Sequence, residues 1–223
     1  MQYEVEVKAL LGSQERADEL LTALQVADVT FSKKSEQTQR NHYFEKGDLH
    51  ALANVFANVF SKEQLDTIKE IAAKATKFSV RSRQRNNDVL LVIKGSLDDR
   101  SAIHSVRRME FEESVPTTLE ELDEKIISAG FELEAKWSAQ RTVYAFKDMT
   151  VDMIFSPGYG YMAELEKVVE DETSVEDARK NILATLEEFG LEELNPERHD
   201  RMYAHYNAHW PEYYGTTNVF TIV

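Results

Sequence analysis

Hydrophobic and polar residues alternate with a period of two along several stretches of this chain, as in strands with one apolar and one polar face. The clearest example is residues 2–11, where Glu4, Glu6 and Lys8 alternate with Val5 and Val7. An exposed edge strand would give this pattern, and so would a strand whose charged face lines a wet, polar cavity. Taken alone, the spacing favours the exposed strand.

Other stretches repeat the alternation and are expected to be further strands. Residues 77–94 predict a hairpin, because two strand-like arms flank the turn-forming sequence Asn86-Asn87-Asp88. The remaining strands are expected at residues 35–45, 105–115, 132–146, 149–155 and 161–169.

Apolar residues that recur every three or four positions predict helices between and after these strands. A helical hairpin at residues 48–76 is expected to be an insertion whose apolar stripe packs on the domain or, alternatively, forms a dimer contact. Asn195-Pro196 is a favourable start for a last helix, which Pro211 is expected to end. Other helices are expected from Ser13, at about residues 119–129, and from Ser174 to Gly190.

The order of these elements favours an α+β fold. Strands and helices do not alternate regularly, so an antiparallel sheet or closed barrel decorated with helices fits best. A length of 223 residues suits one domain, or at most two. We therefore expect a single domain over residues 1–223, with the insertion at about 48–76 and C-terminal helices from about 174.

The composition disfavours several classes of function. A net charge of −14 argues against nucleic-acid binding, which requires a basic surface. The lack of cysteine excludes disulfides and thiolate metal sites. The chain begins with a strand pattern in place of a leader, and no apolar run is long enough to cross a bilayer. These features predict a cytoplasmic protein with neither nucleic-acid nor membrane partners.

Charged residues recur inside the predicted strands, each time opposite apolar neighbours. The acids are Glu4, Glu6, Glu110, Glu112, Asp152, Glu164 and Glu166, and the bases are Lys8, Arg81, Arg83, Lys94, Arg108, Lys136 and Arg141. So many ions cannot be buried against hydrocarbon, whereas a water-filled tunnel that binds a metal and a polyanion would accommodate them. Carboxylates without cysteine select a hard cation, Mg²⁺ or Mn²⁺, and clustered arginine and lysine select phosphate oxygens.

Several of these residues stand in motifs that resemble those of the CYTH domains, also called triphosphate tunnel metalloenzymes. Glu4-Val-Glu-Val-Lys8 resembles the ExExK signature of that family. The other matching elements follow in the family's order across about residues 2–190: Arg81-Ser-Arg83 with Lys94-Gly95, Arg108-Met-Glu110-Phe-Glu112, Lys136 with Arg141-Thr-Val-Tyr144, Asp152, Pro157-Gly-Tyr-Gly160 and Glu164-Leu-Glu166. The hairpin at 48–76 looks like an insertion relative to the family's usual short linker.

The resemblance implies an eight-stranded antiparallel β-barrel whose tunnel binds a triphosphate together with Mg²⁺ or Mn²⁺. The implied metal ligands are Glu4, Glu6, Asp152, Glu164 and Glu166, while Glu110 and Glu112 either serve the metal or orient arginines. The implied triphosphate contacts are Lys8, Arg40, Arg81, Arg83, Lys94, Arg108, Lys136 and Arg141. The predicted catalytic residues are Glu4, Glu6, Lys8 and Asp152.

Three functions are compatible with these residues. The first is a metal-dependent triphosphatase acting on an inorganic or small organic triphosphate, such as thiamine triphosphate or a nucleoside triphosphate. The second is a class IV adenylyl cyclase, which converts ATP to cyclic AMP and pyrophosphate, and the third is a non-catalytic polyphosphate- or nucleotide-binding module. Complete acidic and basic sets favour an enzyme. A base pocket would separate cyclase from phosphatase, and the sequence identifies none.

Overall fold

The computed structural model of the protein describes residues 3–96 and 108–220. Eight strands and six α-helices are present in this described part. The strands are β1 (Tyr3–Gly12), β2 (Ser32–Glu45), β3 (Lys77–Arg85), β4 (Asp88–Ser96), β5 (Arg108–Ser114), β6 (Glu132–Phe146), β7 (Met149–Ser156) and β8 (Gly160–Val169). The helices are α1 (Gln14–Ala27), α2 (Leu49–Val55), α3 (Lys62–Lys74), α4 (Leu119–Ser128), α5 (Val175–Glu188) and α6 (Pro196–Tyr213).

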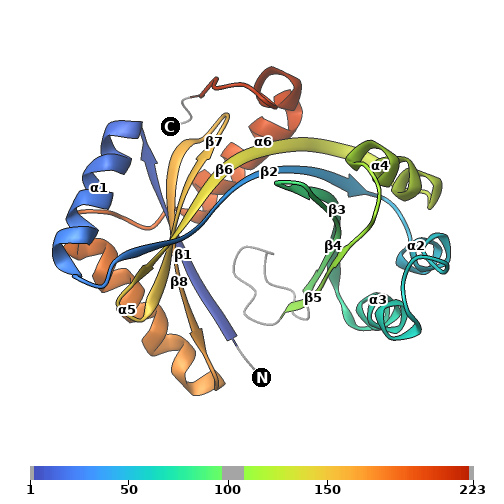
Figure 1. Cartoon of the computed structure of the whole chain (residues 1–223), viewed down its shortest axis with the longest axis horizontal. Coiled ribbons are helices and arrows are strands. Elements are labelled where there is room, and N and C mark those ends of the chain that lie inside the picture. The colour runs from blue at the N-terminus through green and yellow to red at the C-terminus, as the bar shows by residue number, and fades with distance from the viewer. Residues whose placement is uncertain (1–2, 97–107, 221–223) are drawn as a thin grey trace. The chain divides into compact units, whose positions relative to one another are not determined.

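The strands form one antiparallel sheet in the order β1-β8-β7-β6-β2-β3-β4-β5 (Figure 1). The α+β fold and the eight antiparallel strands are confirmed, whereas closure of the sheet into a barrel stays a prediction. The chain divides into two compact units. Unit 1 comprises Met1–Thr38 and Ser138–Val223, and unit 2 comprises Gln39–Trp137. The single domain expected from the length also stays a prediction.

In unit 1, one face of the β1-β8-β7 sheet is apolar and packs on α1 and α5 (Figure 1). Val5 and Val7 are buried on that face, whereas Glu4 and Glu6, which alternate with them, are exposed on the other face. Helix α5 contributes Ile182 to the same core. The alternation in β1 therefore has the effect that its period of two predicted. The valines pack against the helices, and the charged residues lie on the face that the helices do not cover.

In unit 2, helices α2, α3 and α4 cover one face of the sheet (Figure 1). Apolar residues of the inserted segment, such as Leu52, Phe56 and Ile68, are fully buried in one cluster with Leu91 of β4 and Leu122 of α4. The apolar stripe of the insertion is thus used inside unit 2. This is the packing alternative of the two that the sequence left open.

The helix starts follow the capping signals in the sequence. Ser61 and Gln64 form a complete capping box at the start of α3, and Asn195 caps α6 through the backbone N–H of Arg198. The expectation that Pro211 ends α6 is wrong. The backbone departs from helical geometry at His209, with φ −127°, and the helix then continues to Tyr213. A kink there relieves the clash of the proline ring with the preceding turn.

The tail after α6, for which the sequence offered no prediction, binds the turn between β7 and β8. Gly158 donates its N–H to the carbonyl of Asn218 at 2.7 Å and accepts from the N–H of Phe220 at 2.9 Å. The two bonds form a short parallel bridge in unit 1. None of the helices in the described residues is both long and apolar enough to cross a membrane.

Candidate functional site

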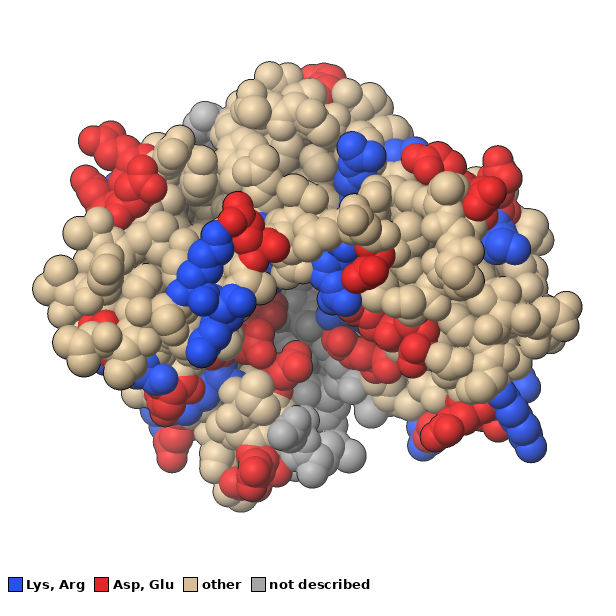
Figure 2. All heavy atoms as spheres, viewed as in Figure 1, with Lys and Arg blue, Asp and Glu red and all other residues tan. Residues whose placement is uncertain are grey.

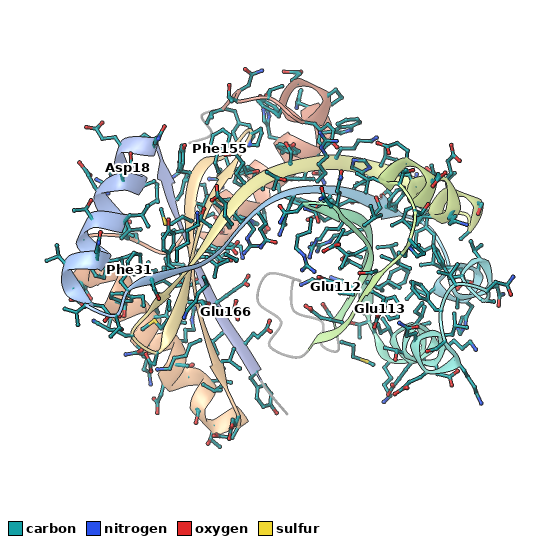
Figure 3. All side chains as sticks on the ribbon, in the orientation of Figure 1. Asp18, Phe31, Glu112, Glu113, Phe155 and Glu166 are labelled. Carbon is teal, nitrogen blue, oxygen red and sulfur yellow. The ribbon has the colours of Figure 1, made fainter. Side chains whose placement is uncertain are left out.

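Unit 1 gathers carboxylates on the face of its sheet that the helices do not cover. In the antiparallel register, Glu6 of β1 lies opposite Glu166 of β8, and Glu164 of β8 lies opposite Asp152 of β7. Glu4 shares this face because it is two residues from Glu6 on the same strand. Figure 3 shows Glu166 on the side of the sheet away from α1. Five predicted metal ligands from three strands thus share one face.

Two predicted phosphate contacts, Lys8 and Arg141, are ion-paired inside this acidic cluster. Lys8 Nζ lies 3.2 Å from Glu164 Oε1 and also contacts Glu6. Arg141 Nη2 lies 2.9 Å from Glu164 Oε2 and also contacts Asp152. With all groups ionised, five carboxylates face two cations, which leaves an excess of negative charge on this face.

The excess negative charge alters the protonation of the acids. Burial, and then repulsion by Glu4, Glu6 and the other carboxylates, raises the pKa of Glu166 to about 7. Burial also raises the pKa of Asp152, although Arg141 acts in the opposite direction. An acidic cluster with an excess of negative charge suits a divalent metal with oxygen ligands. In the described ranges no three His, Asp or Glu side chains stand as a metal-ligand group, and Lys8 and Arg141 are paired with Glu164 of this cluster.

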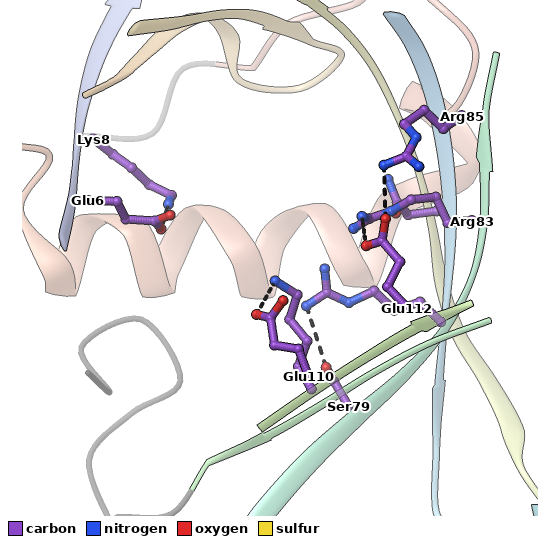
Figure 4. A network of polar contacts seen from close by, with 10 residues as sticks. Glu6, Lys8, Ser79, Arg83, Arg85, Glu110 and Glu112 are labelled. Carbon is purple, nitrogen blue, oxygen red and sulfur yellow. Dashed lines mark hydrogen bonds and ion pairs between the residues drawn. The ribbon is translucent and has the colours of Figure 1, made fainter. Parts of the chain in front are cut away.

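Unit 2 gathers basic residues on the sheet face that its helices do not cover. Arg81, Arg83 and Arg85 alternate along β3, and Lys94 follows on β4 opposite Ser79. Glu112 of β5 accepts from Nη1 of both Arg83 and Arg85 at 2.9 Å (Figure 4). One carboxylate thus holds two guanidinium groups side by side.

Glu110 binds Lys94 in the way that Glu112 binds the two arginines. Lys94 Nζ donates to Glu110 Oε1 at 2.7 Å. Figure 4 labels Glu110. Figure 3 labels Glu112 and its neighbour Glu113, which alternate along β5, so only Glu112 shares the basic face. Of the two roles implied for Glu110 and Glu112, these contacts match the orienting one, and a role at the metal stays a prediction.

Arg81 is held by different contacts and retains an unused donor. Its guanidinium carbon lies 4.4 Å from the centre of the Tyr43 ring, and Nη2 donates weakly to Ser79 at 3.4 Å. Its Nε is buried and has no hydrogen-bond partner among the described residues. A buried donor on a basic face suits an anionic ligand such as phosphate.

The structure separates two predicted phosphate contacts, Arg40 and Lys136, from this basic face. Arg40 pairs with Gln84, so it lies on the opposite face of the sheet and is exposed there. Lys136 Nζ lies 3.9 Å from the carboxylate of Asp123, a residue of α4 on the helix-covered face. Arg108 begins β5, but its side chain lies outside the described residues. Arg40, by strand register, and Lys136, by its contact with Asp123, therefore do not lie on this basic face, and phosphate binding by either residue stays a prediction.

Sequence reasoning missed several polar residues of unit 2. Arg85 extends the i, i+2 series of Arg81 and Arg83, so the period of the strand could have revealed it. Asn41 accepts a 2.7 Å hydrogen bond from Arg83 Nε, and only the pairing of β2 with β3 brings the two together. The carboxylate of Asp123 contacts His42 of β2 and Ser82 of β3. No pattern in the sequence indicated this buried polar residue.

On the face of the molecule shown in Figure 2, Lys and Arg side chains lie beside Asp and Glu side chains. Neither the positively nor the negatively charged side chains form one continuous patch over this face. This agrees with the ion pairs in both units, where each charged set is partly neutralised by residues of the other sign.

Solved structures with the same fold come from several organisms. A conserved hypothetical protein of Pyrococcus furiosus superposes with a TM-score of 0.59 at 19% identity, covering 85% of this chain and 91% of that one. A protein of Vibrio parahaemolyticus named as a candidate adenylate cyclase gives 0.58 at 16% identity, covering 91% and 98%. A Hippeastrum protein, named as a candidate adenylyl cyclase with a dominant triphosphatase activity, gives 0.53 at 15% identity, covering 92% and 96%.

These identities establish the fold alone. A search of curated proteins gave no match. The model of the CYTH domain, in contrast, matches residues 2–199, which include the acidic face of unit 1 and the basic face of unit 2. The chain therefore belongs to the CYTH domain family.

Proposed function

We propose that this protein is a metal-dependent phosphohydrolase that cleaves a small inorganic or organic triphosphate. The observation that carries the proposal is that carboxylates cluster on the uncovered sheet face of unit 1 and basic residues cluster on the uncovered sheet face of unit 2. Unit 1 offers five carboxylates with an excess of negative charge, and unit 2 offers Arg81, Arg83 and Lys94 with a buried, unused Arg81 donor. The first set is suited to a hard cation and the second to phosphate oxygens.

The CYTH family is generally metal-dependent, and the donor set of unit 1 fits that requirement. Glu4, Glu6, Asp152, Glu164 and Glu166 would hold Mg²⁺ or Mn²⁺. When bound, such a cation neutralises charge on phosphate oxygens, which is the main requirement of phosphoryl transfer.

The chain's own part is to bind and orient the phosphates. Arg83 presents a guanidinium fork that matches two phosphate oxygens, and Asn41 and Glu112 fix the direction of that fork. Lys94 adds a point charge that Glu110 holds in place. Because both acidic and basic sets are present, we favour hydrolysis over simple binding of a polyphosphate.

The test is to incubate the purified protein with each of tripolyphosphate, thiamine triphosphate and ATP in turn, in the presence of Mg²⁺ or Mn²⁺. We expect release of orthophosphate that depends on the metal. Formation of cyclic AMP and pyrophosphate from ATP would instead identify an adenylyl cyclase. Tight binding of tripolyphosphate without any turnover would identify a binding module and contradict the proposal.

A matched pair of variants ties turnover to the acidic face. Glu166→Gln removes a carboxylate from the cluster, and we expect it to reduce turnover at least a hundredfold with the fold intact. Glu19→Gln makes the same chemical change at an exposed position of α1 in the same unit and should leave turnover unchanged. Equal rates in the two variants would remove Glu166 from the site.

A further inference from the structure

A buried polar network lies behind the basic face of unit 2, on the side of the sheet that α4 covers. Ser82 Oγ donates to Asp123 Oδ1 at 2.5 Å, and His42 Nδ1 lies 2.7 Å from Asp123 Oδ2. Because an ionised carboxylate only accepts hydrogen bonds, His42 donates through Nδ1. Ser82 has no exposed surface, His42 is 2% exposed and Asp123 is 9% exposed.

The two strand residues that Asp123 holds are direct partners in the sheet. His42 of β2 pairs with Ser82 of β3 in the antiparallel register. A single carboxylate from α4 therefore joins neighbouring strands at one point. Asp123 shares the buried side of α4 with Leu122 and Ile126, both completely buried, so apolar packing already attaches the helix to the sheet.

We call Asp123 and the two residues that it contacts, His42 and Ser82, the clip. The sequence neighbours of His42 and Ser82 belong to the basic face or orient it. Ser82 stands between Arg81 and Arg83, and side chains alternate along a strand, so those two arginines point to the opposite side. In the same way His42 stands between Asn41 and Tyr43 on β2. The register pairs Asn41 with Arg83 and Tyr43 with Arg81.

Both orienting contacts cross the strand pair that the carboxylate holds. Arg83 Nε donates to Asn41 Oδ1 at 2.7 Å, and the Arg81 guanidinium carbon lies 4.4 Å from the centre of the Tyr43 ring. A small shift of β2 relative to β3 would change both contacts at once. Displacement of a binding group by about 1 Å is enough to cost large factors in rate.

We infer that Asp123, with His42 and Ser82, is a positioning residue that aligns Arg81 and Arg83 for phosphate from behind the sheet. The inference rests on the proposed function, since it concerns the same arginines. A buried carboxylate is a costly way to fasten a helix compared with apolar residues, and buried polar networks can instead enforce one specific arrangement. The network thus supplies alignment, and Leu122 and Ile126 supply attachment.

The test compares Asp123→Asn with Thr118→Ala. The first change is isosteric but removes the charge and one acceptor of the clip. The second removes the cap of α4, where Thr118 accepts from the N–H of Glu121, and leaves the clip intact. Both variants loosen α4, so thermal unfolding of each gives the loss of stability against which binding is judged.

Binding of tripolyphosphate is then measured by calorimetry in the whole protein. We expect Asp123→Asn to weaken binding about tenfold, as for one misaligned charge-assisted contact, and to raise KM more than it lowers kcat. Thr118→Ala should bind within about twofold of the parent at a similar loss of stability. Equal effects of the two variants on affinity would show that the network only supports the helix, and would overturn the inference.

A spectroscopic readout is independent of ligand. The Nε–H of Arg83 should give a protected nitrogen-15 NMR signal in the parent and in Thr118→Ala, and lose protection in Asp123→Asn. If Asp123→Asn does not fold, Ser82→Ala removes one arm of the clip and should show the same change to a smaller extent. Unchanged Arg83 protection and unchanged affinity in the folded clip variant overturn the inference.

Failure of the proposed function would look different. A parent protein that binds no tripolyphosphate contradicts that function, and the inference that rests on it falls as well. A parent that binds tightly, together with an Asp123→Asn variant that binds equally tightly, contradicts only the positioning role.

Discussion

At the scale of single residues, Arg83 has the most closely defined side-chain orientation of the basic face. Its Nε is committed to Asn41 and its Nη1 to Glu112, so its fork is aimed before any ligand arrives. We expect Arg83→Lys to weaken tripolyphosphate binding although the charge is kept, because lysine lacks the planar fork that matches two phosphate oxygens. Arg83→Ala should weaken it about tenfold to a hundredfold, the value of one charge-assisted contact.

Calorimetry with tripolyphosphate measures this effect. Lys69→Ala is the control, because it removes one positive charge from an exposed position on α3 of the same unit. If Arg83→Ala binds as tightly as Lys69→Ala, the basic face is a solvated surface without a role in phosphate binding.

Glu166 makes a second prediction at this scale, which concerns pH. Its pKa in the folded protein is about 7, above the ordinary value of about 4.5 expected for the unfolded chain. The folded state therefore binds more protons than the unfolded state between these values, and stability must fall as pH rises through this window. Glu166→Gln should abolish this part of the pH dependence.

Urea unfolding with EDTA present, at pH 5 and at pH 8, measures the difference. Because the side chain is partly exposed, we expect Glu166 to account for about 1 to 2 kcal/mol of the loss at pH 8 and not for the full value of the shift. The idea fails if the parent and Glu166→Gln lose the same stability between the two pH values.

At the scale of elements, the β7–β8 turn and the C-terminal tail form one structure in unit 1. Gly158 has φ +85°, and a Cβ there would lie 2.7 Å from atoms of both Phe220 and Tyr206. Alanine at this position would meet the strain of a positive φ and also displace the rings that cover the turn. We expect Gly158→Ala to destabilise the protein by about 2 to 4 kcal/mol.

Gly190→Ala separates the two contributions. Gly190 has φ +65° and open space around its Cβ position, so that variant should show only the backbone strain of about 1 to 2 kcal/mol. Chemical denaturation of both variants gives the comparison. Equal losses would mean that the tail does not pack on the turn in solution.

At the scale of the whole molecule, the charged faces and the apolar cores are separate. The core of each unit consists of apolar side chains between sheet and helices, on the opposite face from the clustered carboxylates or arginines. We therefore expect EDTA to stop turnover without unfolding the protein. Far-UV circular dichroism should be unchanged on chelation, and a collapse of the signal would show that the metal is structural.

Local patterns in the sequence were sufficient for most elements and for the alternation of polar and apolar positions within a strand such as β1. Alternation of Glu4, Val5 and Glu6 is a property of one strand, and it can be interpreted without knowing the neighbours. The same is true of the capping box of α3 and of the apolar stripe in residues 48–76. The charged residues predicted a metal and a polyanion, and the family motifs added the expectation that the polyanion is a triphosphate.

Only the tertiary structure decided which residues meet. Arg40 and Arg81 both lie in strands, but the register of β2 on β3 puts them on opposite faces. Lys136 and Arg141 are an odd number of positions apart on β6, so an uninterrupted strand cannot direct both to one side. The pairing of Lys8 and Arg141 with carboxylates, and of Asp123 with His42 and Ser82, depends on contacts between distant segments. Such contacts follow from strand order and helix packing, which are collective properties of the folded chain that no local pattern specifies.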